Sequence, residues 1–445
     1  MNAKESLEDA IDAVFAAQQK HQWVQRKTTA KQRIEKLNLL KAAIAAREEE
    51  IQTALYKDLR KDANSVSSGE IEDIYHEIDD TIAHLAQWMA PTTIEASPAL
   101  GDATAKTIYE ARGIVLLFGP WNFPFVLVFR PLVQALSAGN CVIVKPNEMA
   151  PETSAVTAKI IQDVFQPEEV AVFEGDVSLA NALLELPVDH IFFTGSPAVG
   201  KIVMRAAAQH LASVTLELGG KNPVVIDRHA GIAEAAQKIA VLRNLNSGQV
   251  CLCPENVYVH ESQYHEFLAV VKATYEAMFY KDGVLDQDVQ GRIVDERNHK
   301  RVTGYLDDAR AKGAEVVTGG DAIDSSLGIH PTILTNVPDD AIILQEEVFG
   351  PILTVFTYSD IGEVYDTLHQ QAKPLALYIF SEDESFIEDV LANTTSGGVT
   401  INHCVMHYSE PQLPFGGVNA SGMGRYHSIH GFRELSHERA VLQME

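Results

Sequence analysis

The amino-acid sequence predicts an α/β protein with buried, parallel β-sheets. Two observations lead to this prediction. From residue 114 onward, short apolar runs alternate with amphipathic stretches of helical length, and this alternation is typical of βαβ units. Before that point, the first 90 residues are rich in Ala, Glu, Lys and Leu and contain no proline, which favours helices.

The composition excludes several classes of protein. Apolar residues make up 46% of the 445 positions and charged residues 22%, close to ordinary globular averages, so a disordered, collagen-like or disulfide-scaffold protein is excluded. At roughly 150 residues per domain, a chain of this length is expected to form about three domains. With 35 Lys and Arg against 61 Asp and Glu, the net charge is −26, which argues against binding to a nucleic-acid backbone.

The N-terminal region is expected to be helical and to carry no targeting signal. Helices are predicted at residues 3–20, 30–60 and 70–89, and a loop- and strand-like segment at 91–113. The chain does not start with basic residues followed by an apolar core, so we expect no signal peptide. No run reaches the roughly 18 apolar residues of a membrane helix, and four cysteines do not make a disulfide framework. We therefore expect a reduced, cytoplasmic protein without a membrane anchor.

Two series of strands and helices follow. In the first series, strands are predicted at residues 114–118, 142–145, 170–173, 191–193 and 214–218, and helices at 130–138, 153–165, 180–185 and 198–210. In the second series, strands are predicted at 222–226, 257–259, 315–317, 353–356 and 399–402. The two series meet at Gly219-Gly220, where we place a domain boundary.

Cys251 is a candidate nucleophile. It ends the run NSGQVC, which lies between a helical stretch and a strand. A thiolate at a glycine-containing turn can be exposed and activated, whereas the alternative is a small buried hydrophobic residue. Cys253 would face the other way if this segment is extended, and Cys141 is expected in the core. The cysteines lack the Cys-x2-Cys spacing of a zinc site, so no metal is predicted.

Glu217 and Asn122 are polar residues in apolar surroundings, where burying a polar side chain costs free energy unless it has a role. Glu217 interrupts an apolar strand. It is either the partner of Lys221 in a salt bridge or a general base that activates water, with a pKa raised by an apolar site. Asn122 lies between prolines and aromatic residues after the first strand of the sheet, where open α/β sheets bind ligands. It is either a turn residue or a hydrogen-bond donor to an oxyanion.

The run FTGSPAVG, which joins a strand to a helix, is a candidate phosphate-binding loop. Gly195 permits a tight turn, and the following helix offers free backbone N–H groups to a pyrophosphate. The run is not the GxGxxG fingerprint, and many strand–helix turns contain Gly-Ser. Lys145 and Glu148, at the end of the second strand, are either ligands of ribose hydroxyls or solvated loop charges.

Taken together, these features resemble the aldehyde dehydrogenase superfamily over nearly the whole chain. The matching motifs are PWNFP, KPNE, FTGSPAVG, LELGGKNP, SGQVC, EEVFGP and LPFGGVNASGMGRYH. The most specific feature is the separation of 34 positions between Glu217 of LELGGK and Cys251 of GQVC. The closing GMGRYHSIHGFRELSH is most similar to the class 3 branch, the dimeric fatty and aromatic aldehyde dehydrogenases, near the coniferyl-aldehyde dehydrogenases.

The resemblance implies a role for each candidate residue. Cys251 would attack the aldehyde carbon, Asn122 and the backbone N–H of Cys251 would hold the oxyanion, and Glu217 would activate the water that releases the acid. The implied cofactor is NAD, with NADP also tolerated, and it carries the hydride chemistry while the protein orients it. The cofactor-binding residues implied are Lys145, Glu148, Gly195, Ser196, Gly200, Glu347 and Phe349.

The resemblance also implies a domain organisation. A Rossmann-like NAD(P)-binding domain would comprise residues 1–93 and 114–218, an α/β catalytic domain 219–424, and a small β oligomerisation element 94–113 and 425–445. A homodimer is expected, and the implied substrate is an apolar medium-chain, long-chain or aromatic aldehyde. Three positions depart from the family pattern in the region of the substrate pocket: Cys253, His403 and Asn419.

Two other functions remain open. A CoA-acylating dehydrogenase would pass the acyl group to CoA instead of water, and Glu217 argues against it because that branch does not need the base. A catalytically silent structural member of the fold would not need Cys251, Glu217 and Asn122, all of which are intact.

Overall fold

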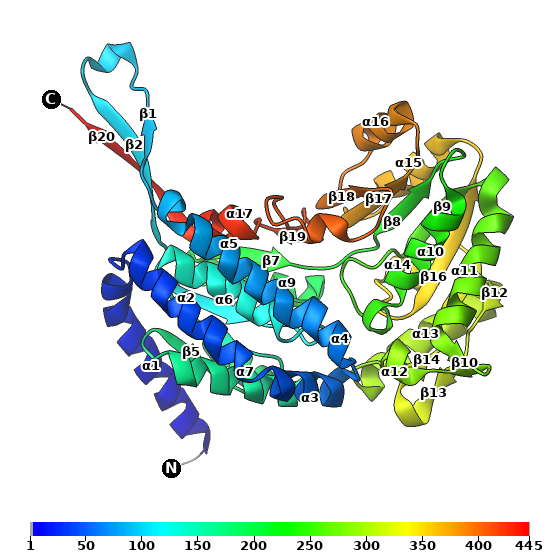
Figure 1. The fold of residues 1–445 in the computed structure, drawn as a ribbon, viewed down its shortest axis with the longest axis horizontal. Coiled ribbons are helices and arrows are strands. Elements are labelled where there is room, and N and C mark those ends of the chain that lie inside the picture. Colours follow the sequence, from blue (N-terminus) through cyan, green and yellow to red (C-terminus); the bar gives the residue numbers. More distant parts are fainter. Residues whose placement is uncertain (1–2, 445) are drawn as a thin grey trace. The chain divides into compact units, whose positions relative to one another are not determined.

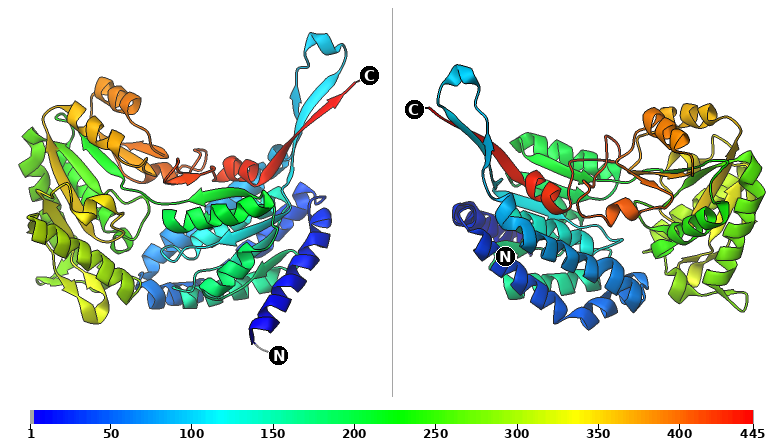
Figure 2. Two further views of the ribbon diagram at one scale, coloured as in Figure 1. Left: turned by 180° about the vertical axis from the view of Figure 1, so that it is seen from behind. Right: turned by 45° about the horizontal axis from the view of Figure 1, so that its top comes forward.

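The computed structural model describes residues 3–444, with side chains described from residue 7 onward. The chain divides into two compact units. Unit 1 contains residues 1–54, 63–216 and 424–445, and unit 2 contains residues 55–62 and 217–423. Figures 1 and 2 show the elements of both units.

Unit 1 is a parallel sheet covered by helices. Its sheet has the strand order β7-β6-β3-β4-β5, and the pairs β3–β4, β3–β6 and β4–β5 are parallel. The strands are β3 (Ile114–Phe118), β4 (Cys141–Lys145), β5 (Val170–Val172), β6 (His190–Thr194) and β7 (Ser213–Glu217). The helices between them are α6 (Val126–Ala138), α7 (Pro151–Val164), α8 (Val177–Leu184) and α9 (Pro197–His210).

The N-terminal helices pack on this sheet and on one another. They are α1 (Ala3–Gln25), α2 (Ala30–Ala45), α3 (Glu48–Leu59), α4 (Ala63–Val66), the π-helical turn η1 (Ser67–Ile71) and α5 (Glu72–Trp88). The predicted helix over residues 30–60 is interrupted at Ala46 and Arg47, which end α2 before α3 begins. Helix α6 is buried along its whole length, and the carboxylate of Glu70 accepts the backbone N–H groups of Phe125 and Val126 at its first turn, 3.1 and 3.0 Å away. A buried carboxylate at this position satisfies donors that the helix leaves unpaired.

A three-stranded antiparallel arm belongs to unit 1. Its order is β1-β2-β20, formed by β1 (Thr92–Ile94), β2 (Thr104–Ala111) and β20 (Ser436–Gln443). The turn η2 (Pro98–Leu100) joins β1 to β2, and α17 (Ser428–Glu434) precedes β20. Figure 1 shows the arm projecting from the helices and sheet of unit 1, with the C-terminal end on β20.

Unit 2 holds a seven-stranded sheet of order β12-β15-β16-β9-β8-β17-β18. All neighbouring pairs are parallel except β12–β15 at the edge. The strands are β8 (Pro223–Ile226), β9 (Asn256–His260), β12 (Glu315–Thr318), β15 (Thr332–Thr335), β16 (Ile352–Tyr358), β17 (Ala376–Phe380) and β18 (Gly398–Ile401). Strands β15 and β17, each next to an edge strand, were not among the strands predicted from the sequence.

Helices and short strands complete unit 2. The longer helices are α10 (Ile232–Arg243), α11 (Tyr264–Phe279), α13 (Glu296–Lys312), α15 (Ile361–Gln370) and α16 (Glu384–Asn393). The short elements are η3 (Leu245–Gly248), η4 (Glu261–Gln263), β10 (Tyr280–Lys281), β11 (Val284–Leu285), α12 (Gln287–Gln290), β13 (Ala322–Ile323), η5 (Asp324–Ser326), β14 (Gly328–Ile329), α14 (Ile342–Gln345), η6 (Met406–Tyr408) and β19 (Gly422–Met423). No described helix is long and apolar enough to span a bilayer.

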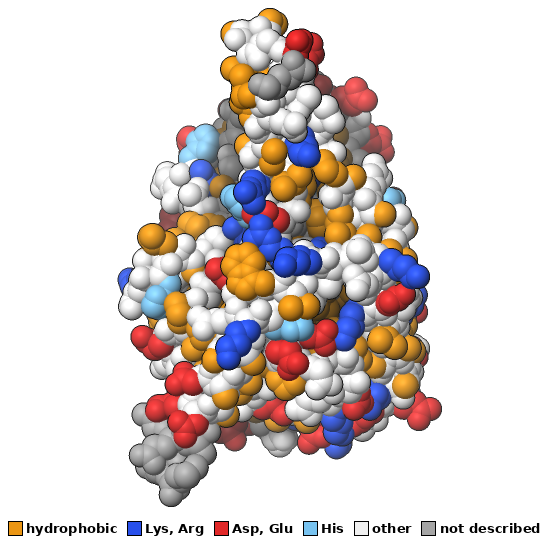
Figure 3. Space-filling model, turned by 90° about the vertical axis from the view of Figure 1, so that its left-hand side faces the viewer, with side chains coloured by type: hydrophobic (Ala, Val, Ile, Leu, Met, Phe, Trp, Pro, Cys, Tyr) orange, Lys and Arg blue, Asp and Glu red, His pale blue; other side chains and the backbone are white. Residues whose placement is uncertain are grey.

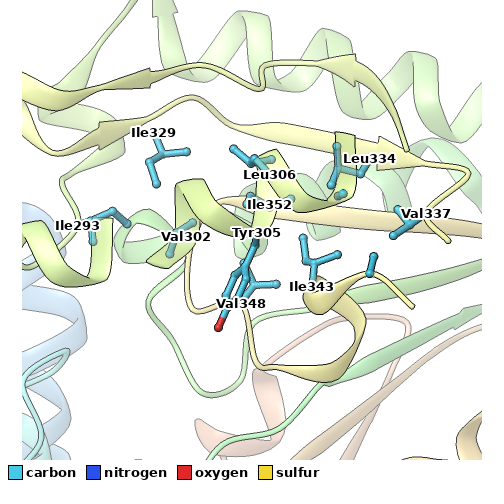
Figure 4. Close-up of a cluster of buried hydrophobic side chains, with 12 residues drawn as sticks. Ile293, Val302, Tyr305, Leu306, Ile329, Leu334, Val337, Ile343, Val348 and Ile352 are labelled. Carbon is cyan, nitrogen blue, oxygen red and sulfur yellow. The ribbon is translucent and has the colours of Figure 1, made fainter. Parts of the chain in front are cut away.

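Two apolar clusters hold helices to the unit 2 sheet. One joins α13 and α14 to β15 and β16, and Figure 4 shows Val302 and Leu306 of α13 among the aliphatic side chains of those strands. The other joins α15 and α16 to β8, β9, β16 and β17. Each fully buried aliphatic side chain stabilises the folded state by about 1.5–3 kcal/mol. These clusters therefore hold the helices firmly on the sheet.

The two sheets share one arrangement around the first strand of each unit, although the unit 2 sheet continues with β15 and β12 beyond β16. Read outward from the first strand of each unit, three strands run one way (β3-β4-β5 and β8-β9-β16) and two run the other way (β6-β7 and β17-β18). We call the side where the parallel strands begin the amino edge and the side where they end the carboxyl edge. In unit 1, β4 and β5 lie on one side of β3, and the next strand, β6, lies on its other side. In unit 2, β17 lies in the same way on the other side of β8 from β9 and β16. Such a position is called a switch point, and open α/β sheets have a crevice there at the carboxyl edge.

Candidate functional site

In unit 2 the candidate residues gather at the amino edge. Cys251 lies in a turn before β9, and Glu347 and Phe349 precede β16. Glu217 is the last residue of β7 and begins the segment that leads to β8. Because β8, β9 and β16 are adjacent and in register near their first residues, the segments before them meet at one edge. The interactions described below confirm that Cys251, Glu217 and Glu347 are close enough for their charges to interact.

The loop that carries Cys251 has a strained backbone. Asn246 and Ser247 have φ values of 49° and 57°, which non-glycine residues rarely adopt. Gly248 has a φ of 75°, and a Cβ there would lie 2.3 Å from the carbonyl carbon of Gly350. Only glycine allows the loop before Cys251 to approach the loop before β16 so closely.

Two buried side chains hold the carbonyl groups around Cys251. The amide nitrogen of Asn222 donates to the carbonyl oxygens of Cys251 at 2.7 Å and Cys253 at 3.0 Å, and its oxygen accepts the backbone N–H of Ala376. The hydroxyl of Tyr378 donates to the carbonyl oxygen of Leu252 at 2.5 Å. Asn222 is 1% exposed and Tyr378 is fully buried, so this clamp is rigid and fixes the thiol-bearing turn against β17.

The surroundings of the Cys251 thiol favour its protonated form. Its surroundings withdraw the sulfur from bulk water and raise the pKa of Cys251 well above the usual value, and the nearby carboxylates of Glu347 and Glu217 raise it further. Cys251 is nevertheless partly exposed, unlike the other three cysteines, which are buried. Attack by this sulfur therefore requires a base that takes its proton.

Glu347 lies against the backbone of the LELGGK segment. A Cβ on Gly219 would collide with the Glu347 carboxylate, and the backbone N–H of Gly220 donates to that carboxylate. Burial raises the pKa of Glu347 to about 8, and Glu255 raises it too, while the Gly220 N–H, Lys221 and Arg301 lower it.

Lys221 pairs with Glu255 and not with Glu217. The Lys221 ammonium also donates to the carbonyl oxygen of Ile343 at 2.7 Å. Glu255 in turn accepts the backbone N–H of Val348 at 3.1 Å. The salt bridge considered from the sequence is therefore not formed, and Glu217, which is 3% exposed, keeps its carboxylate near Cys251.

The thiol of Cys253 points into the core. Cys253 follows Cys251 through a turn and not through extended chain, because its N–H donates to the Val250 carbonyl. Its sulfur donates to the carbonyl oxygen of Leu242 at 3.2 Å. Burial raises its pKa to about 12. Cys253 is thus a buried neighbour of Cys251.

In unit 1 the candidate residues lie at the carboxyl edge. Asn122 follows β3 and is 5% exposed. Lys145 ends β4, is buried, and forms an ion pair with Glu148 three residues later. Asn147 joins the two loops, since its amide donates to the carbonyl oxygen of Gly119 at 3.2 Å.

The loop after β6 has the features of an anion-binding helix start. A Cβ on Gly195 would lie 2.6 Å from the Phe193 ring, so the tight turn requires glycine. Ser196 is the N-cap of α9, where its side chain accepts the N–H of Val199, and Gly200 is buried one turn later. The hydroxyl oxygen of Thr194, at the end of β6, is buried and has no hydrogen-bond partner among the described residues.

Each unit thus offers a distinct kind of chemistry. Unit 2 offers a thiol with acidic neighbours, which suits covalent catalysis. Unit 1 offers a helix start, a lysine and a glutamate at a switch point, which suit a dinucleotide. Among the described residues, no group of His, Cys, Asp and Glu is arranged to hold a metal ion.

Comparison with known proteins decides the family. The model of the aldehyde dehydrogenase family matches residues 2–441. The chain belongs to the aldehyde dehydrogenase family. AldX of Bacillus subtilis (strain 168), which carries an aldehyde dehydrogenase name, is 46% identical over 439 residues that cover 98% of each chain. A coniferyl aldehyde dehydrogenase of Pseudomonas (strain HR199) is 40% identical over 370 residues, which cover 82% of this chain and 76% of that protein.

Solved structures show the same fold. The substrate-bound state of Staphylococcus aureus AldH has a TM-score of 0.94 and 36% identity and covers 100% of this chain and 95% of that chain. An NADP-dependent enzyme of E. coli has a TM-score of 0.91 and 27% identity, covering 98% and 91%. The α/β fold and the family expected from the sequence motifs are confirmed, including relatives in the class 3 and coniferyl-aldehyde branches.

Sequence reasoning missed the residues that hold the Cys251 turn. Asn222 and Tyr378 were not selected, although Asn222 stands in LELGGKNP directly before an apolar strand. The reasoning applied to Glu217, that a polar residue beside a buried strand needs a partner, would have selected Asn222 too. Tyr378 lies within an apolar strand and gives no such signal.

Proposed function

We propose that this protein oxidises an aldehyde to the carboxylic acid with NAD(P), using Cys251 as the nucleophile. The observation that carries the proposal is the partly exposed Cys251 thiol, whose backbone is clamped by Asn222 while two carboxylates lie close by. A nucleophile held in this way needs little reorganisation to reach a carbonyl carbon. The thiol proton must leave first, and Glu217 is the base we assign to that step or to the activation of water.

Covalent catalysis divides the reaction into two stages. Cys251 adds to the aldehyde carbon and forms a thiohemiacetal, which becomes a thioester when the substrate is oxidised. Glu217 then removes a proton from water, the hydroxide adds to the thioester carbonyl, and the C–S bond breaks to release the acid and the thiolate. We assign donation to the oxyanion to the Asn122 amide and to the Cys251 backbone N–H.

The carboxyl edge of unit 1 fits the cofactor of this reaction. Ser196 and Gly195 would hold the pyrophosphate at the start of α9, and Lys145 and Glu148 the adenosine ribose. The buried Thr194 hydroxyl lacks a protein partner, as expected where a ligand supplies one. NAD(P), when bound, supplies the hydride acceptor. NAD or NADP is bound in structures of similar proteins, including an NAD+ complex from Bacillus cereus and a complex of 3,6-anhydro-L-galactose dehydrogenase.

Other cofactor contacts come from unit 2. We assign Glu347 and Phe349 to the nicotinamide ribose and ring. In unit 1, Gly200 in the first turns of α9 is assigned to the cofactor together with Gly195 and Ser196. The domains proposed are the cofactor domain at 1–93 and 114–218, the catalytic domain at 219–424, and the oligomerisation element at 94–113 and 425–445.

The substrate class follows from the relatives. Proteins 36–40% identical to this chain are named for coniferyl aldehyde, for a diaponeurosporen aldehyde and as family 3 member A2. We infer that the substrate is an apolar medium-chain, long-chain or aromatic aldehyde. We also infer that the protein acts in the cytoplasm. Rates of NADH formation across alkanals, benzaldehyde and cinnamaldehydes test the inferred substrate class, and a preference for acetaldehyde would contradict it.

We also infer a homodimer. Within the described residues, β20 pairs only with β2, so its other edge is available to a second copy. Figure 3 faces the side that bears the arm, and lysine and arginine side chains gather in the middle of that view. A hollow of about 610 Å³ beside the arm is lined by three arginines and two glutamates, so it offers charges of both signs to a second copy: Arg112, Arg425, Arg433, Glu434 and Glu438. Light scattering tests this, and a monomer mass at micromolar concentration would reject it.

An absorbance assay for NADH tests the activity itself. Formation of NADH from an aldehyde without CoA is the expected result. A requirement for CoA would favour the acylating dehydrogenase, and the absence of NADH with every aldehyde would favour a silent structural protein.

A further inference from the structure

The carboxyl edge of unit 2 contains a cavity that the proposed chemistry does not use. The cavity has a volume of about 540 Å³ and is lined by residues that directly follow β8, β9, β16 and β17. These strands are adjacent in the sheet (Figure 1), and β8 and β17 flank its switch point. Pockets of 300–1,000 Å³ at this position are where open α/β sheets bind small ligands.

This cavity is remote from Cys251 within unit 2. Cys251 precedes β9, whereas His260 ends β9 and lines the cavity. The five residues of the strand separate the two edges by roughly 15 Å, at about 3.3 Å per residue. The cavity therefore is not part of the site assigned to aldehyde oxidation.

Three carboxylates in the cavity wall are fixed hydrogen-bond acceptors. Asp360 is the N-cap of α15 and accepts the N–H of Gly362 at 2.9 Å, and Asp383 is the N-cap of α16 and accepts the N–H of Ser385 at 2.9 Å. Asp227 is 4% exposed and accepts the hydroxyl of Ser381 at 3.0 Å. A carboxylate has about four acceptor positions, so each retains acceptors for a ligand.

His260 supplies a ring nitrogen with no protein partner. Its Nδ1 is occupied by Ser262, whose hydroxyl oxygen lies 2.8 Å away and whose backbone N–H lies 3.3 Å away, which leaves Nε2 for a ligand. Nε2 has no hydrogen-bond partner among the described residues, although the side chain is only 9% exposed. Because His260 lines the cavity, a ligand hydroxyl can hydrogen-bond to this nitrogen in either tautomer of the ring.

Aromatic side chains complete the wall. The rings of His260 and Tyr358 pack edge to face with centroids 5.5 Å apart. Phe386 lines the cavity from the first turn of α16, and Tyr358 donates its hydroxyl to the carbonyl oxygen of Ile226. These rings offer apolar surface against which a ligand ring can pack.

We propose that this cavity binds a neutral ligand with vicinal hydroxyl groups on a ring, either a sugar or the ribose of a nucleoside. Hydroxyl groups are the ligand groups that both donate to fixed carboxylates and hydrogen-bond to a ring nitrogen such as that of His260. A phosphate would face three aspartates and only one arginine, Arg228, with His229 and His260 as the other basic side chains of the wall, and is disfavoured. The candidate nucleotide-binding loops of unit 1 also lie at a switch point, which supports the nucleoside form of the ligand.

Calorimetric titration of the full-length protein tests the proposal. The probes are adenosine, D-ribose, AMP and putrescine, each titrated with and without NAD, and the variants below distinguish binding in this cavity from binding at the cofactor site. Saturable binding of adenosine or ribose with one site per chain is the expected result, with AMP at least tenfold weaker than adenosine. Binding of adenosine alone identifies a nucleoside site, and equal binding of ribose identifies a sugar site.

Variants at the cavity wall localise the binding. Ser359→Trp places a large side chain in the wall and should weaken binding at least tenfold, while Ser359→Ala is the matched control and should leave it within twofold. His260→Phe keeps a ring but removes the nitrogen and should also weaken binding at least tenfold. The rate of aldehyde oxidation should not change in the Ser359 variants, which also shows that they are folded.

Three results would overturn the proposal. They are the absence of saturable binding by both adenosine and ribose, binding that persists unchanged in Ser359→Trp, and binding of putrescine alone, which would show a cation site. None of these results depends on whether the protein oxidises aldehydes.

Discussion

The carboxyl edge of unit 1 and the amino edge of unit 2 carry the candidate residues, although both sheets have a switch point beside their first strand. In unit 1 the candidates stand in loops at the switch point, as expected for an open α/β sheet. In unit 2 the thiol and its acidic neighbours lie before the strands, at the opposite edge. Strand order thus predicts where a ligand fits but does not determine which edge carries covalent chemistry.

The two edges also differ in how firmly they hold their residues. The Cys251 turn is clamped by Asn222 and Tyr378, both buried. In unit 1, Lys145 is held by Glu148, whose side chain is 42% exposed. A buried clamp suits a nucleophile that must be placed accurately. The ion pair of Lys145 with the half-exposed Glu148 can separate to admit a ligand. Variants at the amino edge of unit 2 should therefore affect the chemical steps, and variants in the unit 1 loops should affect cofactor binding.

The largest effect is expected from Cys251→Ala. Loss of the nucleophile should lower the steady-state rate of NADH formation by at least about 10⁴-fold, the scale seen when a covalent nucleophile is removed. The matched control is Cys253→Ala, which removes the thiol that donates to Leu242 and should retain activity within about tenfold, since it costs one weak hydrogen bond. Equal loss in both variants would show that the thiols act through folding and not through attack.

Glu217→Gln tests whether the second carboxylate acts at a separate step. Its replacement should lower the steady-state rate by about 10²–10⁴, the range of a lost general base. If its main task is deacylation, the first turnover still yields NADH and the acyl-enzyme accumulates. If Glu217 also deprotonates Cys251, the burst slows and higher pH partly restores it. Stopped-flow absorbance with mass spectrometry of the quenched protein distinguishes these cases, and wild-type turnover would show that Glu217 is structural.

The sequence predicted much of both sheets. Strand β3 was predicted with its observed bounds, and several other strands were predicted to within one residue at each end, because buried parallel strands read as continuous apolar runs. Strand β17 (ALYIF) was not predicted, although it is equally apolar. Strand order could not be predicted, because it depends on contacts between segments far apart in the chain.

The candidate site was only partly predictable. Cys251 and Glu217 could be selected because a thiol at a turn and an acid in an apolar strand are unusual. The clamp by Tyr378, the pairing of Lys221 with Glu255 and the cavity at the carboxyl edge of unit 2 depend on pairs more than 30 positions apart. Spacing in the sequence contains no signal for such pairs.

Asn222→Ala should misplace the nucleophile without removing it. The variant leaves the carbonyl groups of Cys251 and Cys253 and the N–H of Ala376 without their partner, which costs about 1–3 kcal/mol of stability. A shift of the thiol by about 1 Å lowers kcat by roughly 10²-fold. Tyr378→Phe removes a single hydrogen bond and should cost less. If both variants keep wild-type kcat but melt earlier, the clamp serves folding alone.

Glu347 should make the stability of the protein depend on pH. Its pKa is raised from 4.5 to about 8 in the folded protein, so between these values the folded state retains a proton that the unfolded state releases. Its contribution is therefore full below about pH 4.5 and is lost as the pH rises towards 8, by up to about 1.4 kcal/mol per pH unit. Thermal melts at several pH values should show wild type losing stability relative to Glu347→Gln as pH rises. Parallel curves for the two proteins would contradict this.

The smallest effect is expected at the carboxyl edge of unit 1, in the choice of cofactor. The carboxylate of Glu148 accepts from ribose hydroxyls and repels a 2′-phosphate, while Lys145 beside it offsets part of that repulsion. We expect NAD to be preferred and NADP to be tolerated, and Glu148→Gln to raise kcat/KM for NADP by up to about tenfold, or roughly 1.4 kcal/mol. The rate at saturating NAD should stay near that of wild type, because Lys145 and Glu148 are assigned to the cofactor ribose and not to the chemical steps. A wild-type preference for NADP above about tenfold would show that these loops do not read the ribose as inferred, and a fall in kcat at saturating NAD would show that the two edges are not separable in function.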